Sequence, residues 1–375
     1  MLPTESLPPL LAALLCSTLL FRAAVSLYYS DPARVLRISR LRPRLEGTRE
    51  FLYKPLDEWF APLPFVWTWL DIFIAILLAR WFDHPLAWVA VCFWVGGRFR
   101  ALQEFGHNAV HYALCRSHAW QWWLSDVFYQ FPAFKRDMHS RQITHTQEHH
   151  RHPNHEKLDP NRARVRDGGM RGGMTHAQFI GRLFHPLSPS GMMVNLKTMV
   201  RNSLLNHRPS TAVARVVTLL VLSALLYAAA GWKAIVWGWL VPLVSTYSLF
   251  AWVSLLTEHR WFKTPSWSED RLTREFLAGR PTDYRGFSGW MVRVFICPTS
   301  DAYHLAHSLY PGVRWNYLPA IDHVLKVEEP RYTEHASEGL LFSRDGIPSA
   351  LSELKERLVS AETRAEPTLY IQEER

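Results

Sequence analysis

Apolar and polar stretches alternate along the 375-residue chain, and the longest apolar runs fall into two pairs. The runs cover residues 64–82, 86–97, 212–230 and 234–256, and short turn-forming segments at 83–85 and 231–233 join the members of each pair. A helix of about 20 apolar residues is long enough to cross a bilayer. The pattern therefore predicts an all-α integral membrane protein with two transmembrane hairpins, which means about four spanning helices.

The two ends of the chain carry shorter signals. Residues 10–29 are apolar but are interrupted by Arg22, so this segment could span the membrane or lie in its surface. We favour an in-plane or partly buried helix. Near the other end, Leu351, Leu354 and Leu358 recur at helical spacing and predict a short amphipathic helix that packs against the rest of the protein.

Basic residues indicate which side of the membrane each segment occupies. The formal net charge is +9, and arginines are concentrated at 34–54 and across 98–209. Because positively charged segments stay in the cytoplasm, we expect both hairpin turns outside and a cytoplasmic helical cap between the hairpins. We divide the chain into an N-terminal amphipathic region (1–63), a membrane catalytic domain (64–330) and a cytoplasmic C-terminal tail (331–375).

The composition also limits the partners. A strongly basic chain can bind nucleic acid or an anionic membrane surface. No basic stretch carries a nucleic-acid-binding signature, so we expect the membrane as a partner and no nucleic acid. The four cysteines, at positions 16, 92, 115 and 297, are too far apart for a zinc or redox motif and are predicted to be isolated reduced thiols.

Two ionisable residues lie inside the first predicted hairpin. Charged side chains in a membrane segment usually face the interior of the helix bundle. We expect this for Asp71, whereas Arg80 could extend its charged end toward the membrane surface.

Histidines cluster just beyond the predicted membrane segments, most densely at residues 145–155. On an α-helix His145 and His149 would lie about 40° apart, on one face, and His150 would point about 100° further round. One short helix could thus offer imidazoles in two directions. A pair of metal ions needs such an arrangement more than a single ion does.

Other histidines repeat this type of signal. His107 and His111 are four residues apart, His304 and His307 are three apart, and each pair would share a helical face. His259 follows the last apolar run. Any one of these could be accidental, but four histidine-bearing segments at the same inferred membrane depth predict a site for two metal ions.

The type of metal stays open at this point, because imidazole suits iron, zinc, copper and nickel. The zinc-protease signature is absent, since Asn108 occupies the position of its glutamate. Only one Glu-x-x-His motif, at 104–107, is present, whereas soluble di-iron carboxylate bundles need two. A membrane haem protein would need its histidines inside the apolar helices.

Taken together, the histidine segments resemble the histidine boxes of the membrane fatty acid desaturase and hydroxylase family. The matching segments are HNAVH at 107–111, HTQEHH at 145–150, EH at 258–259 and HLAHSLYP at 304–311. The resemblance implies two non-haem iron ions, O2 as co-substrate, and an external electron donor of the ferredoxin or cytochrome type. It implies as metal ligands His107, His111, His145, His149, His150, His259, His304 and His307.

The resemblance implies a desaturase that introduces a double bond into a fatty acyl chain. The family also contains hydroxylases and enzymes that act on small amphipathic or amino-acid-derived natural products, and we keep such a substrate as an alternative. A further alternative is a non-enzymatic membrane protein that only binds metal.

One residue departs from the family pattern. The last box usually ends in two adjacent histidines, but here the second position is Ser308, a poor iron ligand. His139 or His323 could substitute for the missing ligand. Asp159, Pro160 and Glu258 look similar to residues around the family's boxes, which implies no role for them beyond shaping the site. His152 and His155 are expected to be bystanders.

Overall fold

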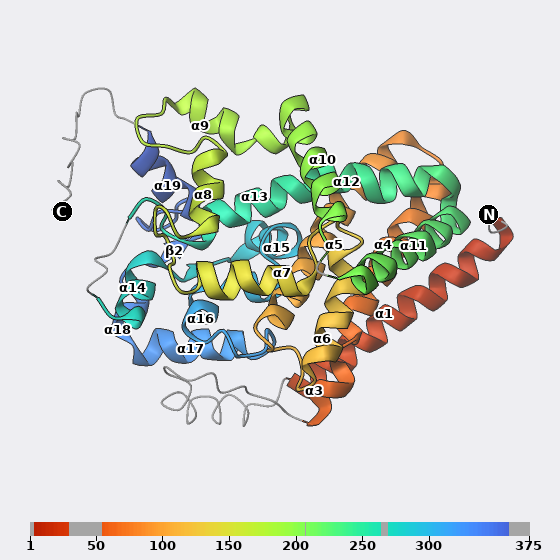
Figure 1. The fold of residues 1–375 in the computed structure, drawn as a ribbon, viewed down its shortest axis with the longest axis horizontal. Helices are drawn as coiled ribbons and strands as arrows, with labels where there is room; N and C mark the ends of the chain where they lie inside the picture. Colours follow the sequence, from red (N-terminus) through yellow and green to blue (C-terminus); the bar gives the residue numbers. More distant parts are fainter. Residues whose placement is uncertain (1–3, 30–54, 207, 264–268, 360–375) are drawn as a thin grey trace.

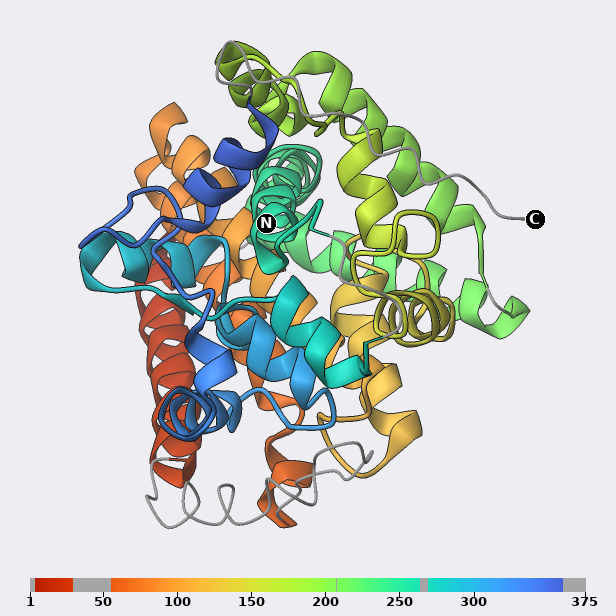
Figure 2. The same cartoon turned by 90° about the vertical axis from the view of Figure 1, so that its left-hand side faces the viewer.

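The computed structural model describes residues 4–29, 55–206, 208–263 and 269–359, and these are mostly helical. Long helices gather at one end of the molecule and short helices at the other, the end that faces the viewer in Figure 2 (Figures 1 and 2). Two short strands, β1 (Thr282–Asp283) and β2 (Ser337–Glu338), pair in parallel. The prediction of a helical protein is confirmed.

Five helices form the apolar end of the molecule and extend from it toward the short helices of the other end. They are α1 (Leu7–Tyr29), α4 (Leu63–Phe82), α5 (Pro85–Val110), α11 (Pro209–Ile235) and α13 (Thr246–Glu258), with α3 (Pro55–Phe60) preceding α4 and α12 (Val241–Val244) preceding α13. Both predicted turns are present. Asp83 adopts a left-handed conformation between α4 and α5, and Gly231, with φ of 63°, reverses the chain inside α11, where a residue with a Cβ would be strained.

Three ranges of the described chain are long and apolar enough to cross a membrane: Leu7–Tyr28, Leu56–Phe82 and Pro209–Glu258. Helix α5 does not qualify, and its second half carries Arg98, Arg100 and Glu104. The structure therefore supports a helical membrane protein. Two spanning hairpins would require α5 to cross the membrane as well, so this finer part of the fold stays a prediction.

Helix α1 packs along α4. Asp71 of α4 is 7% exposed, accepts a hydrogen bond from the hydroxyl of Thr18 at 3.3 Å and pairs with Arg22. Asp71 thus lies inside the bundle, as expected, and its pairing accounts for the arginine that interrupts the first apolar run. Arg80 donates a hydrogen bond to the carbonyl of Ala229 at 2.5 Å and so ties α4 to α11.

The other end, which we call the cap, consists of short helices joined by loops. These are α6 (His118–Ser125), α7 (Met138–Gln142), α8 (Pro160–Asp167), α9 (His176–Leu183), α10 (Pro189–Leu204), α14 (Arg271–Ala278), α15 (Gly286–Phe295), α16 (His304–Leu309), α17 (Leu318–Glu328), α18 (Pro330–Thr333) and α19 (Ala350–Leu358). Helix α19 is the predicted amphipathic helix, and its leucines are buried in a cluster that includes residues of α13.

The four cysteines are all free, as predicted, and three of them are buried.

Candidate metal centre

Eight histidines and one glutamate form two neighbouring groups where α5, α13 and the short helices meet. The first group consists of His107, His111, His145, His150 and His307, and the second of His149, Glu258, His259 and His304. Within each group the atoms that could bind metal all lie within 4.8 Å of one another. All eight histidines implied by the resemblance are thus brought together.

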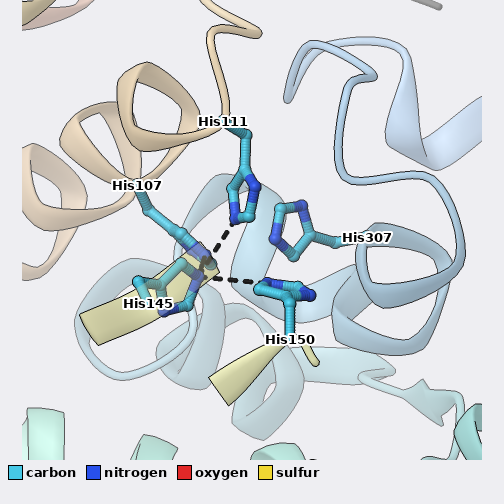
Figure 3. Close-up of side chains that lie close together, drawn as sticks. All are labelled: His107, His111, His145, His150 and His307. Atoms are coloured by element: carbon cyan, nitrogen blue, oxygen red, sulfur yellow. Dashed lines mark hydrogen bonds between the residues drawn. The ribbon is translucent and has the colours of Figure 1, made fainter. Parts of the chain in front are cut away.

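The first group is centred on His145 (Figure 3). Its Nε2 lies 2.6 Å from Nε2 of His107, 3.0 Å from Nε2 of His111 and 3.1 Å from Nε2 of His150. A neutral imidazole nitrogen has either one proton or one lone pair, so hydrogen bonding cannot satisfy three such neighbours at once. Convergence of several lone pairs on one point is the arrangement that a metal ion requires.

His107 and His111 come from the end of α5. His107 lies in its last turn, and His111 is the residue that ends the helix. Their spacing of four residues places both imidazoles in the first group, as predicted.

The segment that carries His145 is a π-helix, Ile143–His149, which corrects the predicted α-helix. The backbone N–H of His150 bonds to the carbonyl of His145 at 3.0 Å, a spacing of five residues. In a π-helix the backbone hydrogen bonds join residues i and i+5, and residue i+5 lies closer to the face of residue i than it does in an α-helix. Consequently His145 shares the first group with His150, and His149, its expected partner, belongs to the second group.

The second group is anchored by His149. Its Nδ1 lies 2.8 Å from Oδ1 of Asp159, and its Nε2 lies 3.3 Å from Nε2 of His259. That Nε2 of His259 is in turn 3.1 Å from Nε2 of His304. Glu258, the last residue of α13, completes the group.

The histidines of the last box also separate. His304 and His307 both lie on α16, but their ring centroids are 6.1 Å apart and one enters each group. The predicted shared face is thus used to link the two groups. Because α16 contributes one histidine to each group, this helix helps to fix how far apart the two groups lie.

Carboxylates occupy the outer side of several imidazoles. Glu104 lies 3.3 Å from Nδ1 of His107, and Asp301 lies 4.0 Å from Nδ1 of His304. Asp159 plays the same part for His149. A carboxylate on Nδ1 holds a proton there and leaves the Nε2 lone pair for a metal.

Burial sets the charge of the imidazoles. It lowers the pKa of seven of them well below the usual value, and neighbouring histidines add to this effect: His107, His111, His145, His150, His259, His304 and His307. Burial also lowers the pKa of His149, but the Asp159 carboxylate outweighs it and raises that pKa. Neutral imidazoles with available lone pairs are the form that binds metal.

The unsatisfied atoms fit a metal as well. Among the described residues, neither ring nitrogen of His307 has a hydrogen-bond partner, although both are buried. Buried polar atoms are rarely left unpaired. The donor set, five histidines in one group and three histidines with a carboxylate in the other, is suited to two divalent ions.

Ser308 joins neither group, although it is buried and its hydroxyl lacks a hydrogen-bond partner. The expected substitutes are not there either: His323 is exposed, and His139 lies outside both groups beside Trp122. Glu258 provides the additional donor instead. Glu258 directly precedes His259 in the sequence, but no sequence pattern indicates that its carboxylate faces the same point.

A cavity of about 330 Å³ opens beside the first group. It is lined by His107 and His145 and by Glu258 of the second group. A separate apolar cavity of about 550 Å³ is lined by aromatic residues of α5, α13 and α15, including Phe93, and by none of the nine residues.

Comparison with known proteins agrees with the geometry. Residues 83–337 match the family described as "Fatty acid desaturase". The chain therefore belongs to the fatty acid desaturase family and is a desaturase-family oxidoreductase. It is similar to "Dihydrorhizobitoxine desaturase" of Bradyrhizobium elkanii, with 25% identity over 297 residues that cover 76% of this chain and 80% of that protein.

Asp159 provides a test of the second group. Asp159→Asn keeps the shape of the side chain but removes the charge that holds the Nδ1 proton of His149, so we expect affinity for metal to fall by about 10- to 100-fold. Metal titration of the purified protein would measure this. Asp167→Asn, at an exposed carboxylate, is the control. Equal affinities in both variants would contradict the assigned role of Asp159.

Proposed function

We propose that this protein is an O2-dependent di-iron membrane desaturase that converts a saturated C–C bond of its substrate into a C=C bond. The observation that carries the proposal is the pair of buried groups containing all eight family-type histidines and Glu258. When bound, two iron ions would supply the chemistry for activating O2 and oxidising an unactivated C–H bond. In the balanced reaction the substrate loses two hydrogens, and O2, two electrons and two protons yield two molecules of water.

The residues of the chain hold and shield this chemistry. The carboxylates of Glu104 and Asp159 orient the imidazoles of His107 and His149, and most of the site's side chains are buried. Whether the product is an alkene or an alcohol depends on how the substrate lies beside the centre. We expect the electrons to come from a separate ferredoxin- or cytochrome-type protein.

We propose a multi-pass arrangement in which α5 is a fourth, shorter span beside the three candidate spans. The cap with the histidines and the basic segments would then lie on the cytoplasmic side. This places the centre at the membrane edge, where an amphipathic substrate can enter from the lipid and the electron donor can approach from water.

For the substrate, the predicted fatty acyl chain and the alternative, a small amphipathic or amino-acid-derived molecule, require different cavities. An acyl chain needs an apolar cavity that reaches the histidines. The cavity that reaches them is lined by many charged residues, and the apolar cavity lies elsewhere. This favours the alternative, and the name of the similar desaturase from Bradyrhizobium elkanii points the same way.

The test combines metal analysis with product analysis. We expect the purified protein to contain close to two iron ions per chain and expressing cells to form a new unsaturated small metabolite from supplied precursors, detected by mass spectrometry. If a new unsaturated fatty acid formed instead, the substrate would be a fatty acyl chain. Protein that lacks iron while still forming the product would overturn the di-iron proposal.

A further inference from the structure

The cavity beside the first group has a strongly charged lining. Its walls come from α5, α7, α8, α13 and the loop before α7. Five basic residues lie in them: Arg100, Lys135, Arg136, Arg141 and Arg164. The acidic residues in the lining are Glu104, Glu258 and Asp301.

The acidic residues are already engaged. Arg100 contacts Asp301 at 2.7 Å and Glu104 at 3.4 Å, and Glu258 belongs to the second histidine group. Within the described residues, no ion pair joins any of the other four basic side chains to a carboxylate of the cavity. The lining therefore carries more basic than acidic side chains.

Lys135 is the clearest case. In the part of the chain that the structure describes, no ion pair or hydrogen bond joins its ammonium to a carboxylate, and the ammonium lies 5.3 Å from the centre of the Tyr247 ring. Burial, together with the nearby charges of Arg164 and Arg141, lowers the pKa of Lys135 to about 7. Burying an unpaired cation is costly, and an anion bound in the cavity would remove that cost.

Two arginines could support the same anion. Arg141 stacks over the ring of Tyr129, with its guanidinium carbon 5.6 Å from the ring centre, and Arg164 projects from α8 at the exposed side of the cavity. A planar guanidinium can bind a carboxylate through two parallel hydrogen bonds. Arg100, in contrast, is held by its own carboxylates.

We propose that this cavity binds the free carboxylate of a small aliphatic acid, with Lys135 as the main contact and Arg141 and Arg164 as supporting contacts. The inference rests on the proposed function and specifies its substrate class: an acid with an unesterified carboxylate, in place of an acyl ester or thioester. The aliphatic part would extend from Lys135 toward His107 and His145, which line the same cavity. The distance from the carboxylate would then select the carbons that are oxidised.

The size of the cavity agrees with this class. At about 330 Å³ it lies at the lower end of the range of small-molecule sites. A long acyl tail in contact with several cations would leave their charges without hydrogen-bond partners. A short acid satisfies the cations with its carboxylate and still presents methylene groups to the histidines.

The experiment measures binding of octanoate, octanamide and octanoyl-coenzyme A to the full-length protein in non-ionic detergent by calorimetry. Chelator-treated protein is used so that the carboxylate cannot gain affinity by binding metal. We expect octanoate to bind about tenfold or more tightly than octanamide, which has the same shape without the charge. Equal affinity for the two would overturn the proposal.

Variants locate the contact. Lys135→Gln should abolish the preference for octanoate, Lys135→Arg should retain it, and the control Lys157→Gln, at an exposed lysine, should leave it unchanged. Arg164→Gln, at an exposed position, should weaken the preference severalfold and provides a second test if Lys135→Gln fails to fold. A preference that survives both Lys135→Gln and Arg164→Gln would contradict the assignment.

Octanoyl-coenzyme A separates two sources of negative charge. If it binds more tightly than octanoate and Lys135→Gln does not weaken it, the recognised anion lies outside the cavity and the proposal fails. Weak binding of octanoyl-coenzyme A supports the free acid. Failure of the di-iron proposal would instead appear as missing iron in untreated protein, with the carboxylate preference intact.

Discussion

His145→Ala is expected to remove metal from the first group and to reduce turnover by more than about a hundredfold. The reason is its central position: Nε2 of His145 lies within 3.1 Å of Nε2 of His107, His111 and His150. Changing a residue that only orients a ligand costs about 10- to 100-fold in metal affinity, and removal of the central ligand costs more. Iron content per chain and product formation would both be measured.

His152→Ala is the matched control, because His152 belongs to the same histidine-rich segment but to neither group. We expect it to retain iron and activity. If His145→Ala retained the iron content and the turnover of the unchanged protein, the first group would not be the metal site. A loss in both variants would indicate damage to the segment as a whole.

The resemblance to the histidine boxes named the eight histidines that the structure brings together. The apolar runs favoured nearby ends for distant segments, and His107 and His259 do lie at the ends of α5 and α13, two helices that pack against each other. The turns at Asp83 and Gly231 were equally predictable, because the residues around them favour reversal of the chain.

How the histidines divide between the two groups was not predictable. A helical wheel assumes the spacing of an α-helix, and nothing in the segment 143–149 shows that it adopts the wider π-helical spacing. In the structure this wider spacing is marked by the hydrogen bond from the backbone N–H of His150 to the carbonyl of His145. The expected pairing of His145 with His149 was therefore wrong, although both residues belong to the centre.

The missing ligand at Ser308 shows a second limit. Only histidines, His139 and His323, were expected as replacements, because the family's boxes are defined by histidines. The structure offers the carboxylate of Glu258, which reaches the second group because it ends α13 next to His259. A carboxylate next to a histidine is common in any sequence, so only its position in the fold distinguishes it.

The sequence did not indicate that Arg100 holds Asp301 and Glu104 in place. This guanidinium is 1% exposed and contacts Asp301 at 2.7 Å, Ser254 at 2.9 Å and Glu104 at 3.4 Å. It also donates to the carbonyl of Ile296 at 3.0 Å. One side chain of α5 thereby links α13 to the segment before α16 and fixes two carboxylates that lie beside histidines.

Arg100→Met is therefore expected to lower the free energy of unfolding by about 3–5 kcal/mol, because it leaves Asp301 and Glu104 buried without their counter-charge. Thermal unfolding in detergent would measure the loss. Arg100→Lys keeps the charge but cannot reproduce the branched contacts. Its stability should therefore lie between that of the unchanged protein and that of Arg100→Met. Arg166→Met, at an exposed pair with Asp167, should change stability by less than about 1 kcal/mol. If Arg100→Met and Arg166→Met unfolded at the same temperature, the buried cluster would not stabilise the cap, and the two carboxylates would have to be held by other contacts.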